Sequence, residues 1–110
     1  MSREEVPLGA MEKCEGDFHT KRITKAFHTP GPTPYPTLHH TLTTLDYPSS
    51  VIHRMPDHEG AARVRIDLRF MGGNLVLEVT ATTKGVQVDP FGASEQSELK
   101  VTDVKRKPTP

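Results

Sequence analysis

The stretch of residues 63–81, RVRIDLRFMGGNLVLEVTA, constrains the fold most, because its pattern is that of a β-hairpin. Apolar residues occupy every second position before the glycine pair Gly72-Gly73, and the alternation resumes after it. Glycine accepts the positive φ angles that a two-residue hairpin loop requires. The stretch therefore predicts two antiparallel strands joined by a tight turn at Gly72 and Gly73.

A two-residue loop at these glycines fixes the register of the predicted hairpin. The opposing apolar pairs are then Phe70 and Leu75, Leu68 and Leu77, Ile66 and Val79, and Val64 and Ala81. These side chains share one face, and the other face carries Arg65, Asp67, Arg69 and Glu78. In this register Asp67 lies opposite Glu78, which is a like-charge pair. A hairpin with one apolar face is not stable alone, so the rest of the chain must supply a partner layer.

The remaining chain predicts further short strands and no helix. In residues 1–18, Pro7 and Gly9 disfavour a helix, and a short edge strand is expected there instead. Leu38 and Leu42 would lie on one side of another strand. Alternate prolines between these two regions predict a rigid, polyproline-like connector over residues 28–37. The other strands are expected at residues 19–27, 38–46, 51–55 and 86–91, with a turn at residues 82–85 before the last one.

These elements together predict an all-β fold. The expected architecture is a small antiparallel β-sandwich or open barrel, with the hairpin towards its C-terminal end and the proline-rich connector extended. Residues 1–91 would form this single domain. Residues 92–110 are polar and contain Lys105-Arg106-Lys107, so a disordered C-terminal tail is expected.

Composition restricts the classes of partner. The 110 residues include 14 Lys and Arg against 14 Asp and Glu, and this balance disfavours nucleic acid as a partner. No apolar run approaches the length of a membrane span, and the N-terminal residues lack the layout of a signal peptide, so no membrane partner is expected. A single cysteine, Cys14, forms no internal disulfide, which favours a reducing, cytoplasmic location.

The sequence has no motif that carries catalysis. Cys14 and His19 are near each other in sequence, but no nucleophile signature surrounds them, and no glycine-rich loop precedes a helix. We therefore expect no enzyme, no catalytic residues and no cofactor. The six histidines lack metal-ligand spacing and we expect no metal site, although a small metal-binding protein stays an alternative. These histidines are His19, His28, His39, His40, His53 and His58.

Three blocks of sequence, spread over residues 7–85, resemble one known family. The blocks are Pro7-Leu8-Gly9 with Thr20-Lys21-Arg22-Ile23, then Pro30 and Pro36 with Thr43, Asp46, Val51, His53, Met55 and Glu59, and finally RIDLRF with NLVLEVTATTKG. Together they resemble a shortened, divergent copy of the substrate-binding β-sandwich domain of the seventy-kilodalton heat-shock (DnaK-like) chaperones. The chain departs from that family at Pro48 and His58, and nothing in it is similar to the family's nucleotide-binding domain, linker or helical lid.

The resemblance implies a peptide site, because that family holds an extended peptide by main-chain hydrogen bonds and places one apolar side chain in a pocket. Carried over by position, Val51 would be the pocket wall, Val64 its floor and Thr44 an arch residue. The implied peptide-binding residues are Thr41, Leu42, Thr43, Thr44, Val51, Ile52 and Val64. An ordinary hydrophobic core also explains Val51 and Val64.

The leading functional hypothesis is a non-enzymatic module that binds an extended peptide or protein segment and has no ATPase of its own. The alternative is a structural subunit of a larger homo- or hetero-oligomeric assembly that uses extended arms and edge strands.

Overall fold

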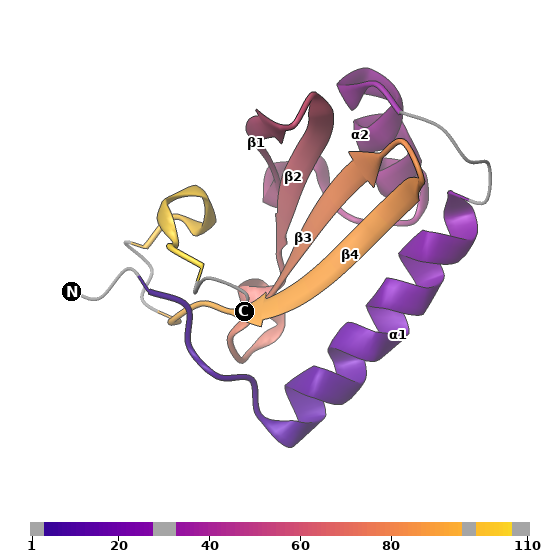
Figure 1. Cartoon of the computed structure of the whole chain (residues 1–110). Helices are drawn as coiled ribbons and strands as arrows, with labels where there is room; N and C mark the ends of the chain where they lie inside the picture. The colour runs from indigo at the N-terminus through magenta and orange to yellow at the C-terminus, as the bar shows by residue number, and fades with distance from the viewer. Residues whose placement is uncertain (1–3, 28–32, 96–98, 107–110) are drawn as a thin grey trace.

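The computed structural model describes residues 4–27, 33–95 and 99–106, and its centre is one four-stranded antiparallel sheet. The strands lie in sequence order, so each is hydrogen-bonded to the next one along the chain. Two helices precede the sheet, and short 3-10 turns lie before β1, between β2 and β3, and after β4 (Figure 1). The elements are α1 (Ala10–Ala26), α2 (Tyr35–Thr44), η1 (Ser49–Val51), β1 (Ile52–His58), β2 (Ala61–Asp67), η2 (Arg69–Met71), β3 (Leu75–Thr82), β4 (Gly85–Gly92) and η3 (Val101–Asp103).

The sheet is covered on both faces. Figure 1 shows α1 and α2 on one side of it and the yellow C-terminal segment on the other. The larger core lies under the helices, and its buried side chains are Ile23, Leu38, Leu42, Tyr47, Ile52, Ala62, Val64, Ile66, Leu68, Leu75, Leu77, Val79 and Ala81. A smaller core lies on the opposite face and consists of Val76, Phe91, Ala93, Leu99, Val101 and Val104.

The prediction of an all-β fold is wrong, since the first half of the chain is helical. Residues 1–18 and 19–27 were expected to form strands, but α1 runs from Ala10 to Ala26. Gly9 is its N-cap residue, and the Glu12 carboxylate accepts a hydrogen bond from the Gly9 N–H at 2.9 Å. The glycine and proline that argued against a helix therefore lie just before it begins. What the structure supports is a small, sheet-rich fold with two helices.

The segment 38–46 is also helical and not a strand. Helix α2 begins at Tyr35 after the N-cap residue Pro34, and Pro36 lies in its first turn, where a missing N–H leaves no hydrogen bond unmade. Its two buried side chains are Leu38 and Leu42, which are one helical turn apart. Of the predicted connector, residues 28–32 lie outside the described residues, and its last three residues belong to α2.

Three predicted features of the C-terminal half are confirmed. The strand expected at residues 51–55 lies within η1 and β1, the strand at 86–91 is β4, and the turn at 82–85 joins β3 to β4. The central hairpin also exists, as β2 paired with β3. Gly72 and Gly73 both have positive φ, at 88° and 89°.

The predicted register of the central hairpin is wrong by two residues. Val64 pairs with Val79 and Ile66 with Leu77, while the Leu68 N–H donates to the Leu75 carbonyl at 3.1 Å. A loop of seven residues, 68–74, joins the strands in place of a two-residue turn, and it includes η2. The predicted pairs of Phe70 with Leu75, Leu68 with Leu77, Ile66 with Val79 and Val64 with Ala81 do not form.

The cause of this difference is local hydrogen bonding and charge. The Asp67 carboxylate accepts from the Arg69 N–H at 3.0 Å, which turns the chain away from the sheet one residue after β2. The observed register places Arg65 opposite Glu78, so an opposite-charge pair replaces the predicted like-charge pair. A shift by two residues keeps every side chain on its predicted face, but it leaves Phe70 in the loop, where it is 63% exposed.

The prediction of a disordered tail does not hold for the described part of residues 92–110. Leu99, Val101 and Val104 are buried against the sheet. The N-terminal residues lie beside this segment, because the Glu5 N–H donates to the Lys105 carbonyl at 3.0 Å. Neither helix of the described residues is long and apolar enough to cross a lipid bilayer.

Candidate segment-binding face

The face of the sheet that points away from the helices, called here the second face, carries the site with the most specific contacts. Alternation along the strands places Arg65 of β2, Glu78 of β3, and Asp89 and Phe91 of β4 on it. The C-terminal segment, defined here as residues 99–106, lies against this face. Its apolar side chains are Leu99, Val101 and Val104, and they pack with Val76, Phe91 and Ala93.

Arg65 holds the middle of the C-terminal segment by its main chain. It is 4% exposed, and its Nη1 donates to the carbonyls of Val101 at 2.6 Å and Val104 at 2.8 Å. Its Nε donates to Glu78 Oε2 at 3.0 Å. Burial lowers the pKa of Arg65, and the charge of Glu78 opposes that shift. Because an arginine stays protonated in proteins, this buried cation has a carboxylate partner and two carbonyl acceptors.

Arg69 binds the first residue of the segment and also Ser94, which precedes the segment. Its Nη1 donates to the Ser94 carbonyl and its Nη2 to the Leu99 carbonyl, both at 2.7 Å. Asp67 fixes the guanidinium, since Oδ1 accepts from Nε and Oδ2 from Nη2 at 2.9 Å each. Burial would raise the pKa of Asp67, but the hydrogen bonds from Arg69 outweigh it and the pKa is lowered. Two arginines thus bind four main-chain carbonyls.

Arg106 ends the described segment in a group of carboxylates. Its Nη2 lies 2.9 Å from Asp89 Oδ2, its Nε 3.3 Å from Glu5 Oε1 and its Nη1 3.6 Å from Glu78 Oε2. Burial would lower the pKa of Arg106, but the charges of Asp89 and Glu5 outweigh it and raise the pKa. The guanidinium carbon also lies 4.3 Å from the centre of the Phe91 ring.

Two hollows adjoin these contacts on the second face. One, of about 410 Å³, lies beside the segment and is lined by His53, Asp67, Arg69, Leu99, Lys100, Val101 and Thr102. The other, of about 420 Å³, extends from the carboxylates near Arg106 towards the hairpin tips and is lined by His58, Glu59, Arg63, Glu78, Thr80, Thr82, Gln87 and Asp89. The second face therefore continues beyond the area that the C-terminal segment covers.

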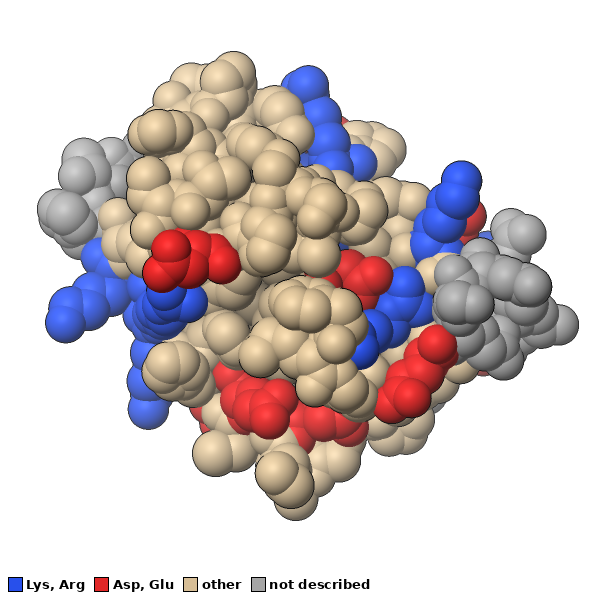
Figure 2. All heavy atoms as spheres, turned by 180° about the vertical axis from the view of Figure 1, so that it is seen from behind, with Lys and Arg blue, Asp and Glu red and all other residues tan. Residues whose placement is uncertain are grey.

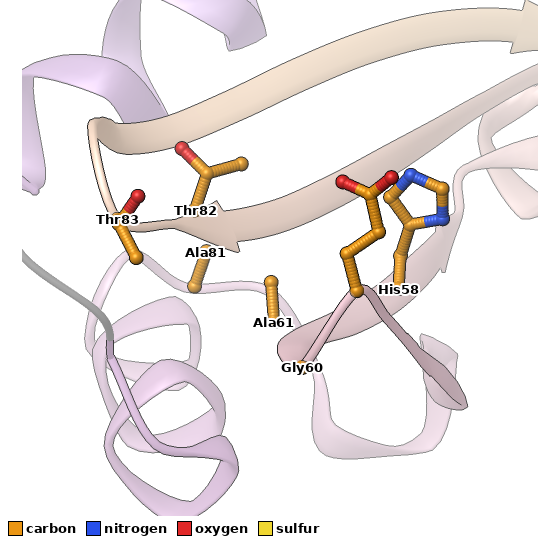
Figure 3. A pocket seen from close by; sticks show the side chains of 7 residues that line it. His58, Gly60, Ala61, Ala81, Thr82 and Thr83 are labelled. Atoms are coloured by element: carbon orange, nitrogen blue, oxygen red, sulfur yellow. The ribbon is translucent and has the colours of Figure 1, made fainter.

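A smaller pocket of about 150 Å³ lies between the tips of the two outer hairpins, β1 with β2 and β3 with β4. Figure 3 shows His58 at one end of it and Thr83 at the other, with Ala61 and Ala81 between them. An adjoining hollow of about 290 Å³ includes Tyr35 and Arg54, whose guanidinium carbon lies 4.2 Å from the centre of the tyrosine ring. These pockets are separate from the arginine contacts.

The charges of the molecule are distributed in small groups. On the side seen in Figure 2, acidic and basic side chains lie next to one another and uncharged residues cover much of the surface. Among the described residues, no group of three histidine, cysteine or acidic side chains is arranged to hold a metal ion.

The structure places the peptide-binding residues implied by the chaperone resemblance in two different settings. Leu42, Ile52 and Val64 come together in the larger core, and Val51 packs against it while partly buried. Thr41, Thr43 and Thr44 lie on α2, where the last two hydroxyls donate to the carbonyls of His40 and Thr41. None of these seven side chains lines any of the four pockets described above.

Sequence reasoning missed the arginines that hold the segment. The sequence predicts Arg65 and Arg69 on one face beside Asp67 and Glu78, which the structure bears out, but it predicts no main-chain acceptor for either arginine. The available signal was the spacing of Leu99, Val101 and Val104 among polar residues, which marks a stretch with apolar side chains to bury.

Fold and site together define a small sheet protein in which arginines of one face bind the main chain of a segment that includes the 3-10 turn η3. Comparisons of the chain with protein families, with curated proteins and with solved structures found no match.

Proposed function

We propose that this protein is a non-enzymatic binding module whose second face holds a peptide segment of a protein. In the described structure its own C-terminal segment occupies that face. The observation that carries the proposal is that Arg65 and Arg69 donate to the carbonyls of Ser94, Leu99, Val101 and Val104. Both carbonyls that Arg65 binds lie at the ends of the turn η3, and hydrogen bonds to main-chain carbonyls depend only weakly on the identity of the side chains.

The packing of the segment supports the same proposal. Leu99, Val101 and Val104 supply apolar anchors, and the polar residues between them remain at the surface. Main-chain hydrogen bonds combined with apolar anchors at intervals are the usual means of binding an extended peptide. A segment from another protein with similarly spaced anchors would make the same contacts in place of residues 99–106.

The alternative, a subunit that assembles through its edge strands, has less support from the sheet. The edge strand β1 contains Pro56, and its pairing with β2 shifts register between Met55 and His58. At the other edge, the Val6 N–H donates to the Gly92 carbonyl at 2.8 Å. Prolines, irregular pairing and covered edges all hinder the addition of a further strand. We therefore place the partner on the second face and not at an edge.

The proposed function is independent of the chaperone resemblance. That resemblance implies a pocket around Val51 and Val64, whereas the proposal uses Arg65, Arg69 and the side of the sheet away from Val64. The two hypotheses make different predictions about which substitutions abolish binding, so one experiment can separate them.

The test is fluorescence anisotropy with a labelled peptide that has the sequence of residues 94–107. The full chain carrying Val101→Asp, whose own segment is weakened, is expected to bind this peptide more tightly than the unsubstituted chain, because the competing segment dissociates more readily. Adding Arg65→Met to Val101→Asp is expected to abolish binding, while adding Val51→Phe is not. Absence of binding to all of these chains would refute the proposed function.

A further inference from the structure

The surroundings of Arg106 form an enclosure for a guanidinium group. Its carboxylates come from three different parts of the chain, namely Glu5 near the N-terminus, Glu78 on β3 and Asp89 on β4. Each carboxylate approaches a different nitrogen of Arg106, at 3.3, 3.6 and 2.9 Å. A planar guanidinium with several nitrogens can form ion pairs with all three carboxylates together, which a single ammonium group does less well.

An aromatic ring forms the floor of this enclosure. Phe91 is 2% exposed, and the guanidinium carbons of Arg106 and Arg65 lie 4.3 Å and 5.0 Å from the centre of its ring. A guanidinium stacks on an aromatic face, whereas the ammonium of lysine is a compact point charge with a strong hydration shell. The ring therefore favours arginine over lysine at this position.

The position of the arginine relative to the apolar anchors is defined as well. Val104 is 4% exposed and lies against the sheet, and Arg106 follows it by two residues. The intervening Lys105 is exposed, and its carbonyl accepts a hydrogen bond from the Glu5 N–H at 3.0 Å. In extended backbone, residues two apart point to the same side, so Val104 and Arg106 both face the sheet.

We propose, resting on the proposed function, that this enclosure is a recognition site for an arginine side chain of the bound segment. The second face would then select segments that carry an arginine two residues after their last apolar anchor. Arg106 fills the site from within the chain, and a partner segment would replace it with an arginine of its own. Lysine-containing and neutral segments would bind the same face more weakly.

The direct test uses the full chain with Arg106→Ala and two small cations, ethylguanidinium and ethylammonium. Titrations are followed by the amide resonances of Phe91 and Asp89 in proton-nitrogen correlation spectra. We expect saturable shifts with ethylguanidinium at a concentration at least about tenfold lower than with ethylammonium, because only the former reproduces the stacking and the ion pairs of separate nitrogens with separate carboxylates.

The matched control is Arg54→Ala, which removes an exposed arginine that lies over Tyr35 and leaves Arg106 in place. In this control, ethylguanidinium is expected to leave the Phe91 and Asp89 resonances unchanged. Equal effects of the two cations on the Arg106→Ala chain, or no saturable effect of either, would overturn the arginine site.

A second measurement covers the case in which Arg106→Ala does not fold. Two labelled peptides of residues 94–107, one natural and one with Arg106→Lys, are compared on the Val101→Asp chain. Tighter binding of the natural peptide, by about tenfold, supports the site. Equal binding refutes arginine recognition and leaves the proposed function standing, whereas no binding of either peptide refutes both.

Discussion

Replacement of Arg65 by methionine is the sharpest test of the arginine contacts on the second face. Methionine is unbranched and fills much of the space of the arginine stem, so Arg65→Met removes mainly the charge and the donors. The substitution leaves the carbonyls of Val101 and Val104 without their donor, and Glu78 loses a partner at 3.0 Å. All three contacts belong to a residue that is 4% exposed.

The expected loss of stability follows from that burial. Removing one partner of a buried ion pair destabilises a protein by about 3–5 kcal/mol. A domain of this size has a free energy of unfolding of about 5–15 kcal/mol, so the loss would be a large fraction of the total. The C-terminal segment would detach first, because Arg65 bonds to it directly.

Arg63→Met is the matched control, since Arg63 is on the same strand and pairs with the same carboxylate. Its Nη1 lies 3.4 Å from Glu78 Oε1, and its side chain is 21% exposed against 5% for Arg65. Partly exposed ion pairs contribute about 0–1 kcal/mol. Urea denaturation monitored by circular dichroism gives the free energy of unfolding of each chain. A loss below about 1 kcal/mol for Arg65→Met, or equal losses for both variants, would refute the reasoning.

Three further predictions concern other parts of the fold. In urea denaturation, Leu68→Ala should destabilise the protein by about 2–5 kcal/mol and Phe70→Ala by less than about 0.5 kcal/mol. The reason is that Leu68 is 3% exposed and Phe70 is 63% exposed. A larger loss for Phe70→Ala than for Leu68→Ala would favour the predicted register over the observed one. Gly92→Ala should lower the thermal midpoint and free the N-terminal residues, since an added Cβ would overlap the Val6 carbonyl oxygen, and unchanged amide shifts at Val6 would contradict this. Burial and the nearby Arg22 lower the pKa of His19, so the stability that neutral His19 contributes is present above pH 6.5 and falls as the pH drops through that value towards the lowered pKa. The urea midpoint of the protein should therefore fall between about pH 7.5 and 5.5, and His19→Gln should make this fall smaller. An equal fall in the variant would show that His19 does not cause it.

The strands of the C-terminal half were predictable because their evidence is local. Alternation in β2, β3 and β4 and the turn residues between them indicate strands independently of the rest of the chain. The register of β2 and β3 depended on the loop, and the loop depended on a hydrogen bond from Arg69 to Asp67. The charge pattern alone indicates the observed register, since only that register places Arg65 opposite Glu78.

The helices were missed because the spacing of their apolar residues is ambiguous. Leu38 and Leu42 are four residues apart, and so are Ile23 and Phe27; residues at this interval share one side of a strand and also one face of a helix. Pro7, Gly9 and Pro34 lie before the helices, where such residues mark a beginning and do not exclude a helix.

The candidate site depends on contacts between parts of the chain that are far apart in sequence. Arg65 and its acceptor Val104 are separated by 39 positions, and Glu5 and Arg106 come from opposite ends. No local pattern specifies such pairs; what the sequence does contain is an excess of charged residues on one face of a hairpin and a polar tail with three apolar residues. A buried arginine needs acceptors, and the C-terminal segment supplies them. Leu99, Val101 and Val104 of that segment need an apolar surface to pack on, and the second face of the sheet supplies it. The same complementarity is what a partner segment would have to reproduce in order to replace residues 99–106.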